Sequence, residues 1–145
     1  MLLTDEMLTA PVVPVAARMR VQPVLVFRLV QGVVGPGVTA LEAVSRVYGG
    51  VALLDDGAVT AVRLGPVGIS PDGLDLTLEA VLLEVDGQIV DTATGAAVGH
   101  PAQALAGVDA VEGLLVMTGG LTEPVEVRPD SRLAAHFTHL GVITL

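Results

Sequence analysis

From Leu74 onward, short apolar runs and turn motifs follow one another in an order that favours a β-rich fold. Leu74–Val85 alternates apolar and polar residues at period two, which is typical of a half-buried strand. Asp86-Gly87 comes next and favours a type I′ hairpin turn, because both residue types tolerate positive φ. A return strand, a short helix that begins at Pro101 and four further strands are then predicted at 88–94, 101–110, 114–118, 125–128, 133–138 and 142–145.

The first half of the chain predicts strands of the same kind. Val24–Val30 is rich in β-branched residues and predicts a strand, and residues 51–54 and 59–64 predict two shorter ones. Asp55-Asp56-Gly57 lies between the shorter pair and is a turn signal. Residues 65–73 contain two prolines and three glycines, so a loop is expected there.

One helix is predicted in this half, after a turn at Gly32–Gly37. Thr39 and Glu42 have the spacing of a capping box, which marks a helix start. Gly49-Gly50 marks the end of that helix. Its apolar residues recur at helical spacing: Leu41, Val44, Val47 and Tyr48.

About nine strands and two short helices in 145 residues indicate one β-rich α+β domain over 1–145, with 1–10 as a lead-in segment. The helices connect strands but do not alternate with every strand, which argues against a doubly wound sheet. The predicted architecture is therefore a curled mixed sheet or a β-barrel-like roll.

Composition excludes several classes of function. The chain has no cysteine and no lysine, which excludes thiolate and lysine Schiff-base chemistry. A net charge of −9 opposes binding to nucleic acid. The first ten residues carry Asp5 and Glu6 without a basic start, and no apolar run reaches the ~18 residues of a membrane span. We therefore expect a cytoplasmic protein without nucleic-acid or membrane partners, and the mean hydropathy of +0.72 favours a homo-oligomer.

Three motifs point to a known family. They are Gly35-Pro36-Gly37-Val38-Thr39, Gly99-His100-Pro101 and Met117-Thr118-Gly119-Gly120-Leu121. Their order resembles 2-keto-4-pentenoate hydratases and their decarboxylase relatives, in the fumarylacetoacetate hydrolase superfamily. The resemblance covers most of this chain and implies the C-terminal-domain fold of that superfamily. The family's N-terminal domain, with its catalytic lysine, has no counterpart in the sequence.

The resemblance also implies where a metal site would lie. Family members carry a Glu-x-Glu pair at the start of a strand, and Gln22 and Val24 stand at those two positions. Counting without gaps from Thr39 places Asp55 at the family's third metal-binding glutamate. A divalent cation prefers oxygen ligands that include carboxylates, and one carboxylate with one amide is a poor set. We therefore expect neither a metal nor another cofactor.

A small-molecule pocket is still expected at this place, since apolar walls with a few polar groups are typical of such sites. The candidate catalytic residues are Asp55 and Asp56, and a solvated turn is the alternative interpretation of both. Glycine would let backbone N–H groups approach an oxyanion, although a bulge or bend would also explain the Thr-Gly-Gly motif. The candidate substrate-binding residues are Arg20, Gln22, Val24, Thr118, Gly119 and Gly120, and Arg18 and Arg28 are further candidates to line the pocket.

The remaining polar candidates have structural interpretations. His100 is expected to hydrogen-bond the backbone at a helix entry. His136 and His139 fall on opposite faces of a predicted strand, so they are a poor metal pair and are expected at the surface. Glu79 and Glu84 are expected to be solvated strand positions.

Three functions from different classes follow. The first is a metal-independent lyase, isomerase or cyclase, for example one acting in natural-product biosynthesis, that shapes a largely apolar substrate chiefly by holding its reacting atoms in place. The second is a residual Mg²⁺- or Mn²⁺-dependent 2-oxo-acid hydratase or decarboxylase anchored by Asp55. The third is a non-catalytic binding or partner subunit.

Overall fold

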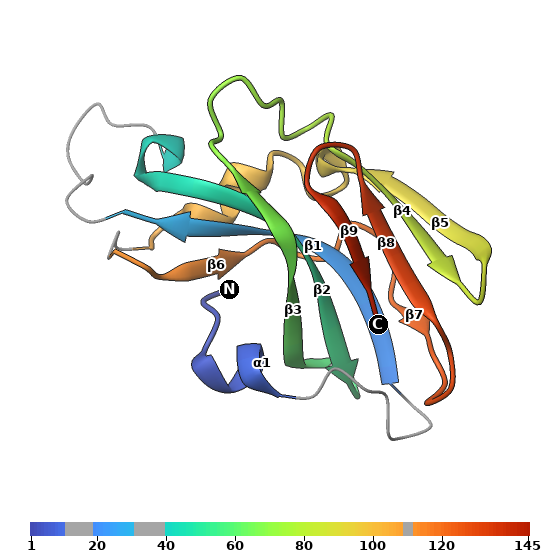
Figure 1. Cartoon of the computed structure of the whole chain (residues 1–145). Helices are drawn as coiled ribbons and strands as arrows, with labels where there is room; N and C mark the ends of the chain where they lie inside the picture. Colours follow the sequence, from blue (N-terminus) through green and yellow to red (C-terminus); the bar gives the residue numbers. More distant parts are fainter. Residues whose placement is uncertain (11–18, 31–39, 109–111) are drawn as a thin grey trace.

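Two antiparallel sheets face each other in the computed structural model, which describes residues 1–10, 19–30, 40–108 and 112–145 (Figure 1). The first sheet has the order β3-β2-β1-β6, with β7 also paired to β1, and the second has the order β5-β4-β8-β9. The strands are β1 (Met19–Leu29), β2 (Val44–Asp55), β3 (Ala58–Ile69), β4 (Ala80–Val85), β5 (Gln88–Thr94), β6 (Leu115–Met117), β7 (Val125–Glu126), β8 (Leu133–Phe137) and β9 (Gly141–Thr144).

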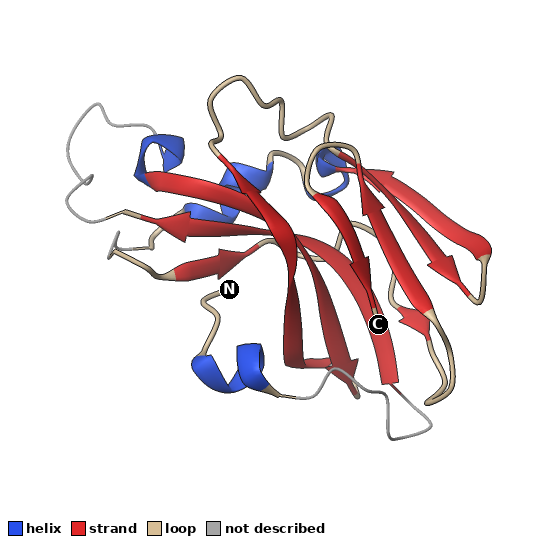
Figure 2. Cartoon of the chain, viewed as in Figure 1, coloured by secondary structure: helices blue, strands red, loops and turns tan. Residues whose placement is uncertain are grey.

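Helical structure is short and lies at the margins of the sheets (Figure 2). It consists of the α-helix α1 (Asp5–Thr9) and the 3-10 segments η1 (Ala40–Ala43), η2 (Gly95–Val98) and η3 (Pro101–Leu105). His100 caps η3, since its Nδ1 accepts the Ala102 N–H at 3.1 Å, as expected for a helix entry. None of these helices has the length and apolar character of a membrane span.

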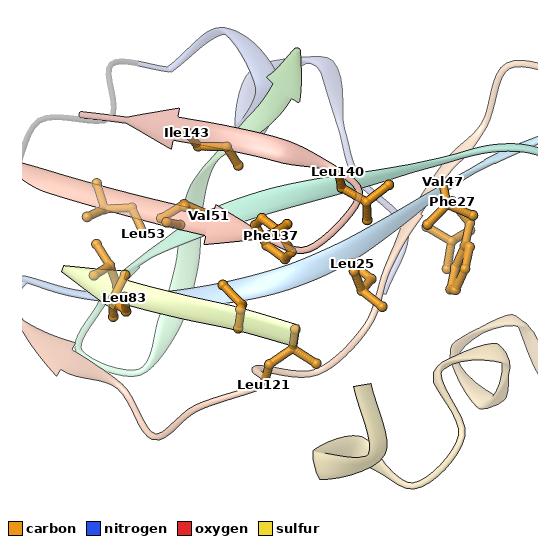
Figure 3. Packing of buried hydrophobic residues seen from close by; sticks show 14 of the residues in the cluster. Leu25, Phe27, Val47, Val51, Leu53, Leu83, Leu121, Phe137, Leu140 and Ile143 are labelled. Atoms are coloured by element: carbon orange, nitrogen blue, oxygen red, sulfur yellow. The ribbon is translucent and has the colours of Figure 1, made fainter. Parts of the chain in front are cut away.

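The predicted β-rich character is confirmed, but the α+β assignment with two short connecting helices is not. Two further details of the predicted architecture are wrong. Every strand pairing in the described ranges is antiparallel, so the sheets are not mixed. The two sheets also do not close into a barrel over those ranges. Instead, they enclose a core between their inner faces, in which Leu25, Phe27 and Leu83 are each 0% exposed (Figure 3).

The predicted helix after Thr39 is largely a strand. Thr39 and the turn predicted at Gly32–Gly37 lie outside the described residues, but β2 begins at Val44 and pairs Val47 with Phe27. Gly49, expected to end a helix, lies within β2 and pairs with Leu25 of β1. Glycine is required there because a Cβ would come within 2.7 Å of the Phe137 ring. Glycine inside a strand often marks such a close approach, and the helical spacing of the apolar residues does not reveal it.

Two other boundaries move for tertiary reasons. β3 continues to Ile69 through the predicted loop, because Gly68 and Ile69 pair with Tyr48 and Val47 of β2. β4 begins only at Ala80, and the alternating residues before it form turns. The Asp86-Gly87 turn has φ values of 52° and 80°, as the predicted type I′ hairpin requires.

Candidate functional site

The outer face of β1 carries the positions at which the family's carboxylates are expected. Alternate side chains of a strand point to opposite faces. Val21, Leu25 and Phe27 belong to the core between the sheets, whereas Val24 and Val26 belong to a second apolar cluster. Arg20 and Gln22 therefore lie on the same outer face as Val24. Along this face the exposed Arg20 is followed by the half-buried Gln22 and the buried Val24.

Gln22 is held by the segment that follows β6. Its Nε2 donates to the Thr122 carbonyl oxygen at 2.9 Å. A Cβ on Gly120 would lie 2.3 Å from the Gln22 Cδ, so only glycine leaves room for the amide. The structure thus brings Gln22 and Gly120 into contact, although 98 positions separate them in the sequence.

Thr118 anchors the two glycines to β1. Its side chain is buried, and its Oγ1 accepts the Leu25 N–H at 3.1 Å and donates to the Gly119 carbonyl oxygen at 2.8 Å. The Leu121 N–H then donates to the Pro23 carbonyl oxygen at 2.9 Å. Between these anchors, the N–H groups of Gly119 and Gly120 donate to no other described residue. Gly119 is exposed, so its backbone is accessible to a ligand.

Asp55 and Asp56 lie apart from this group. Asp55 is the last residue of β2, and Asp56 lies in the turn to β3 with a φ of 50°. Both residues are exposed. Asp55 is opposite Met19, whose side chain belongs to the core between the sheets, so Asp55 is on the other face of the sheet from Gln22. Along β2, Asp55 is also three residues from Ala52, the residue opposite Gln22. This separation is about 10 Å at ~3.3 Å per residue. Arg20 is opposite Leu54 and Glu126, and Arg18 lies outside the described residues.

Val24 is covered by the chain itself. It is 1% exposed and packs in a cluster with Leu3 and Met117, to which Met7 and Leu8 of α1 add apolar contacts. Figure 1 shows α1 beside β3, outside the sandwich. A ligand could therefore contact Val24 only if the N-terminal segment moved.

The residues around Gln22 do not fit a divalent cation. Ala52 is opposite Gln22 in β2, and Gly50 is opposite Val24. Next to Gln22 these partners supply one neutral amide, and the exposed Glu126 opposite Arg20 adds one carboxylate to this face. Hard cations prefer several oxygen ligands with more than one carboxylate among them. No cluster of three or more His, Cys, Asp or Glu side chains occurs in the described ranges.

A pair of polar side chains, Glu79 and His139, forms a contact that the sequence did not predict. Glu79, predicted to be a solvated strand position, is 1% exposed. Its Oε1 accepts the His139 backbone N–H at 2.7 Å, and its Oε2 is 2.7 Å from the His139 Nδ1. Sequence patterns give no signal for this pair, because 60 positions separate the two residues. His136 and Glu84 form a looser pair at 3.3 Å on the more exposed part of the second sheet.

Among the residues that the structure describes, two open grooves line the second sheet, away from Gln22. The larger, of about 500 Å³, is lined by Ala80, Val81, Leu82, Thr92, Ala93, Thr94, His136, Phe137 and Thr138. The smaller, of about 370 Å³, includes Glu84, Arg132 and the C-terminal residues Thr144 and Leu145.

Replacing Gly120 by alanine tests the contact with Gln22. The added Cβ would displace the amide and break its hydrogen bond to Thr122. We expect a loss of about 1–3 kcal/mol in the free energy of unfolding, as is typical of overpacking. Urea unfolding measures the loss, and the Gln22 side-chain NMR signals should shift. A variant with wild-type stability and unshifted Gln22 signals would contradict the geometry.

Comparison with known proteins gives one curated relative by sequence and several solved structures by fold. A 4-oxalocrotonate decarboxylase from Pseudomonas putida is 31% identical over 83 residues, which cover 50% of this chain and 31% of that protein. A structure of 4-oxalocrotonate decarboxylase from Pseudomonas putida G7, complexed with calcium and acetate, superposes with a TM-score of 0.76 at 24% identity. That match covers 87% of this chain and 58% of the decarboxylase chain.

A third match has a different activity in its name. The 5-carboxymethyl-2-hydroxymuconate delta-isomerase from Mycobacterium smegmatis superposes with a TM-score of 0.73 at 15% identity, covering 90% of this chain and 59% of the isomerase chain. This chain therefore spans less than two thirds of the length of these relatives. No protein-family model matches the sequence.

Proposed function

The chain belongs to the fumarylacetoacetate hydrolase superfamily, and from that premise we propose that it is an enzyme that transforms a largely apolar small molecule without a metal ion. The related proteins named above are a decarboxylase and an isomerase. We propose a reaction of the lyase, isomerase or cyclase type, in which no net oxidation or reduction takes place.

One observation carries the metal-independent part of this proposal. On the outer face of β1, Gln22, Val24 and Ala52 together offer a single amide. A site with this composition can orient a polar group of a substrate, but it lacks the charge that holds a hard cation. Asp55, the carboxylate expected to help, is on the opposite face and at the end of the sheet.

The remaining groups suit catalysis by positioning. The Gln22 amide is held by the Thr122 carbonyl, so it can orient a substrate carbonyl with little loss of side-chain freedom. Gly120 packs against this amide, and the backbone N–H groups of Gly119 and Gly120 would stabilise an enolate or another oxyanion. The apolar cluster that contains Val24 would hold the hydrocarbon part of the substrate once the N-terminal segment moved away.

An NMR titration with 2-heptanone, a neutral apolar ketone, tests the site. We expect the largest amide shifts at Gly119, Gly120 and the Gln22 side chain, with the Asp56 and Gly57 amides unchanged as internal controls. Gln22→Leu keeps the size of the side chain and should weaken the binding. Shifts confined to other parts of the protein would overturn the proposed site.

Melting temperatures with millimolar MgCl₂ or MnCl₂ test the alternative of a residual 2-oxo-acid hydratase or decarboxylase. Ligand binding to the native state raises the melting temperature by mass action. Our proposal predicts no metal-dependent shift. A rise of several degrees that Asp55→Ala abolishes would instead support the metal-dependent alternative.

We also propose that the chain forms a homo-oligomer.

A further inference from the structure

Arg28 and Arg46 stand directly opposite each other on the outer face of the first sheet, where β1 pairs with β2. Arg28 is also opposite Leu115 of β6, which belongs to the apolar cluster on that outer face. Both arginine side chains therefore point away from the core between the sheets, and both are exposed. Like charges that lie directly opposite each other destabilise an antiparallel pair. The positions of the two arginines thus work against the stability of the sheet.

No carboxylate of the described residues compensates this pair. The ion pairs within the described ranges are those of His136 with Glu84 and of His139 with Glu79. The chain has 16 acidic residues and only seven basic ones, so an acidic neighbour would be the common arrangement for an arginine. Arg28 and Arg46 instead create a doubly positive spot on a chain whose net charge is −9.

A β-bulge is what places Arg46 on this face. In a regular strand, residues two positions apart point to the same side. Val44 belongs to the core between the sheets, and it pairs with Leu29 although Arg46 pairs with Arg28. Ser45 is therefore the extra residue of the bulge, and its Oγ donates to the Arg28 carbonyl oxygen at 3.2 Å. Bulges often re-aim a side chain in this way, and this one brings the second guanidinium beside the first.

The guanidinium of Arg28 is supported from below by an aromatic ring. Its Cζ lies 5.9 Å from the centroid of the Tyr48 ring. That ring lies against Gly68 of β3, where a Cβ would come within 2.4 Å of the ring. The strand that carries Arg28 is itself held on both sides, by β2 and β6. Part of the freedom that a bound anion would remove from this side chain is therefore already restricted.

Two adjacent guanidinium groups indicate the class of ligand. Each presents a planar fork of N–H donors that matches the oxygens of a phosphate or a carboxylate. A single carboxylate would balance only one of the two charges. A phosphate monoester is close to doubly charged above its second pKa of about 6, so it can balance both.

We propose that Arg28 and Arg46 form a binding site for the phosphate group of a phosphate monoester. The anion lies between the two guanidinium groups and relieves their repulsion. Arg28 is six residues from Gln22 along β1, or about 20 Å at ~3.3 Å per residue. The phosphate site is therefore separate from the Gln22 site, and it does not depend on the reaction proposed there.

An NMR titration of the full chain with methyl phosphate at pH 8 and constant ionic strength tests the site. We expect saturable amide shifts at Arg28, Ser45 and Arg46. Arg46→Gln should weaken the binding by about tenfold or more, because a charge-assisted hydrogen bond is lost. Arg132→Gln is the matched control, since it removes the same charge from an exposed position before β8. Equal losses in the two variants would overturn the proposal, because they would reduce the binding to an effect of net charge.

The class of ligand is tested on the wild-type protein with acetate in place of methyl phosphate. Methyl phosphate should bind about tenfold more tightly or better, because it engages both guanidinium groups. Equal affinities would overturn the assignment to phosphate. Methyl phosphate should also raise the melting temperature of the wild-type protein but not that of Arg28→Gln. The wild-type titrations stand even if a variant fails to fold, and their result is independent of the 2-heptanone titration at Gln22.

Discussion

Phe27→Ala is expected to lower the free energy of unfolding by about 3–5 kcal/mol, the usual cost of truncating a buried aromatic side chain. Phe27 is 0% exposed. It is opposite Val47 in β2 and Val116 in β6, and its side chain points into the core between the sheets (Figure 3). Because core side chains on both sheets surround this position, the structure can collapse only partly into the space that the ring leaves.

Urea unfolding followed by circular dichroism measures this effect. A loss of this size removes a large part of the ~5–15 kcal/mol that stabilises a typical native domain. Leu78→Ala is the control, because Leu78 is 69% exposed and surface substitutions usually change stability by less than about 0.5 kcal/mol. If Phe27→Ala cost no more than Leu78→Ala, the assignment of Phe27 to the core would be wrong.

Gly95→Ala is expected to have the second-largest effect, a loss of about 3 kcal/mol from overpacking and broken hydrogen bonds. A Cβ at Gly95 would lie 1.8 Å from the Leu76 carbonyl oxygen, which is backbone and cannot rotate away. The Gly95 N–H donates to the Glu79 carbonyl oxygen at 2.9 Å, and the Ala96 N–H donates to Thr77 at 3.0 Å. Separating the two segments would weaken both bonds.

Gly119→Ala is the matched control for stability, since its nearest neighbour would be the Val98 side chain at 3.8 Å, an ordinary contact. Thermal and urea unfolding of the two variants should therefore differ by about 2–3 kcal/mol, the typical range for overpacking against an unhindered site. Gly95→Ala should also disturb the NMR signals of His139, because Glu79 lies in the segment that must move. A Gly95→Ala protein as stable as Gly119→Ala would show that these segments are further apart than the structure has them.

Local patterns were sufficient for the features that depend on adjacent residues. The Asp86-Gly87 turn was predictable because its type depends on the φ values of two neighbouring residues. The strands around it followed from β-branched and alternating residues. The cap at His100 followed from its place before Pro101. The family resemblance also located the motif at Thr118–Gly120, which the structure brings against Gln22.

Features that depend on distant contacts were missed. Most residues of the helix predicted after Thr39 form β2 instead, because they pair with β1. The close approach of Phe137 to Gly49 requires a glycine within that strand. Glu79 alternates with its neighbours as a solvated residue would, yet it is buried against His139. Asp55 was predicted to share a site with Gln22, but the two lie on opposite faces of the sheet. The catalytic roles of Asp55 and Asp56 remain predictions.

The sequence by itself determined that this chain folds into β-hairpins with an apolar interior, since alternation and turn residues act within a few positions of one another. Only the tertiary structure decided which residues share a face. Strand register places Gln22 with Ala52 and Val24, and it sends Asp55 to the other side. A shift of one residue in register exchanges the two faces of a strand, so the donors of a site depend on pairings that no local pattern encodes.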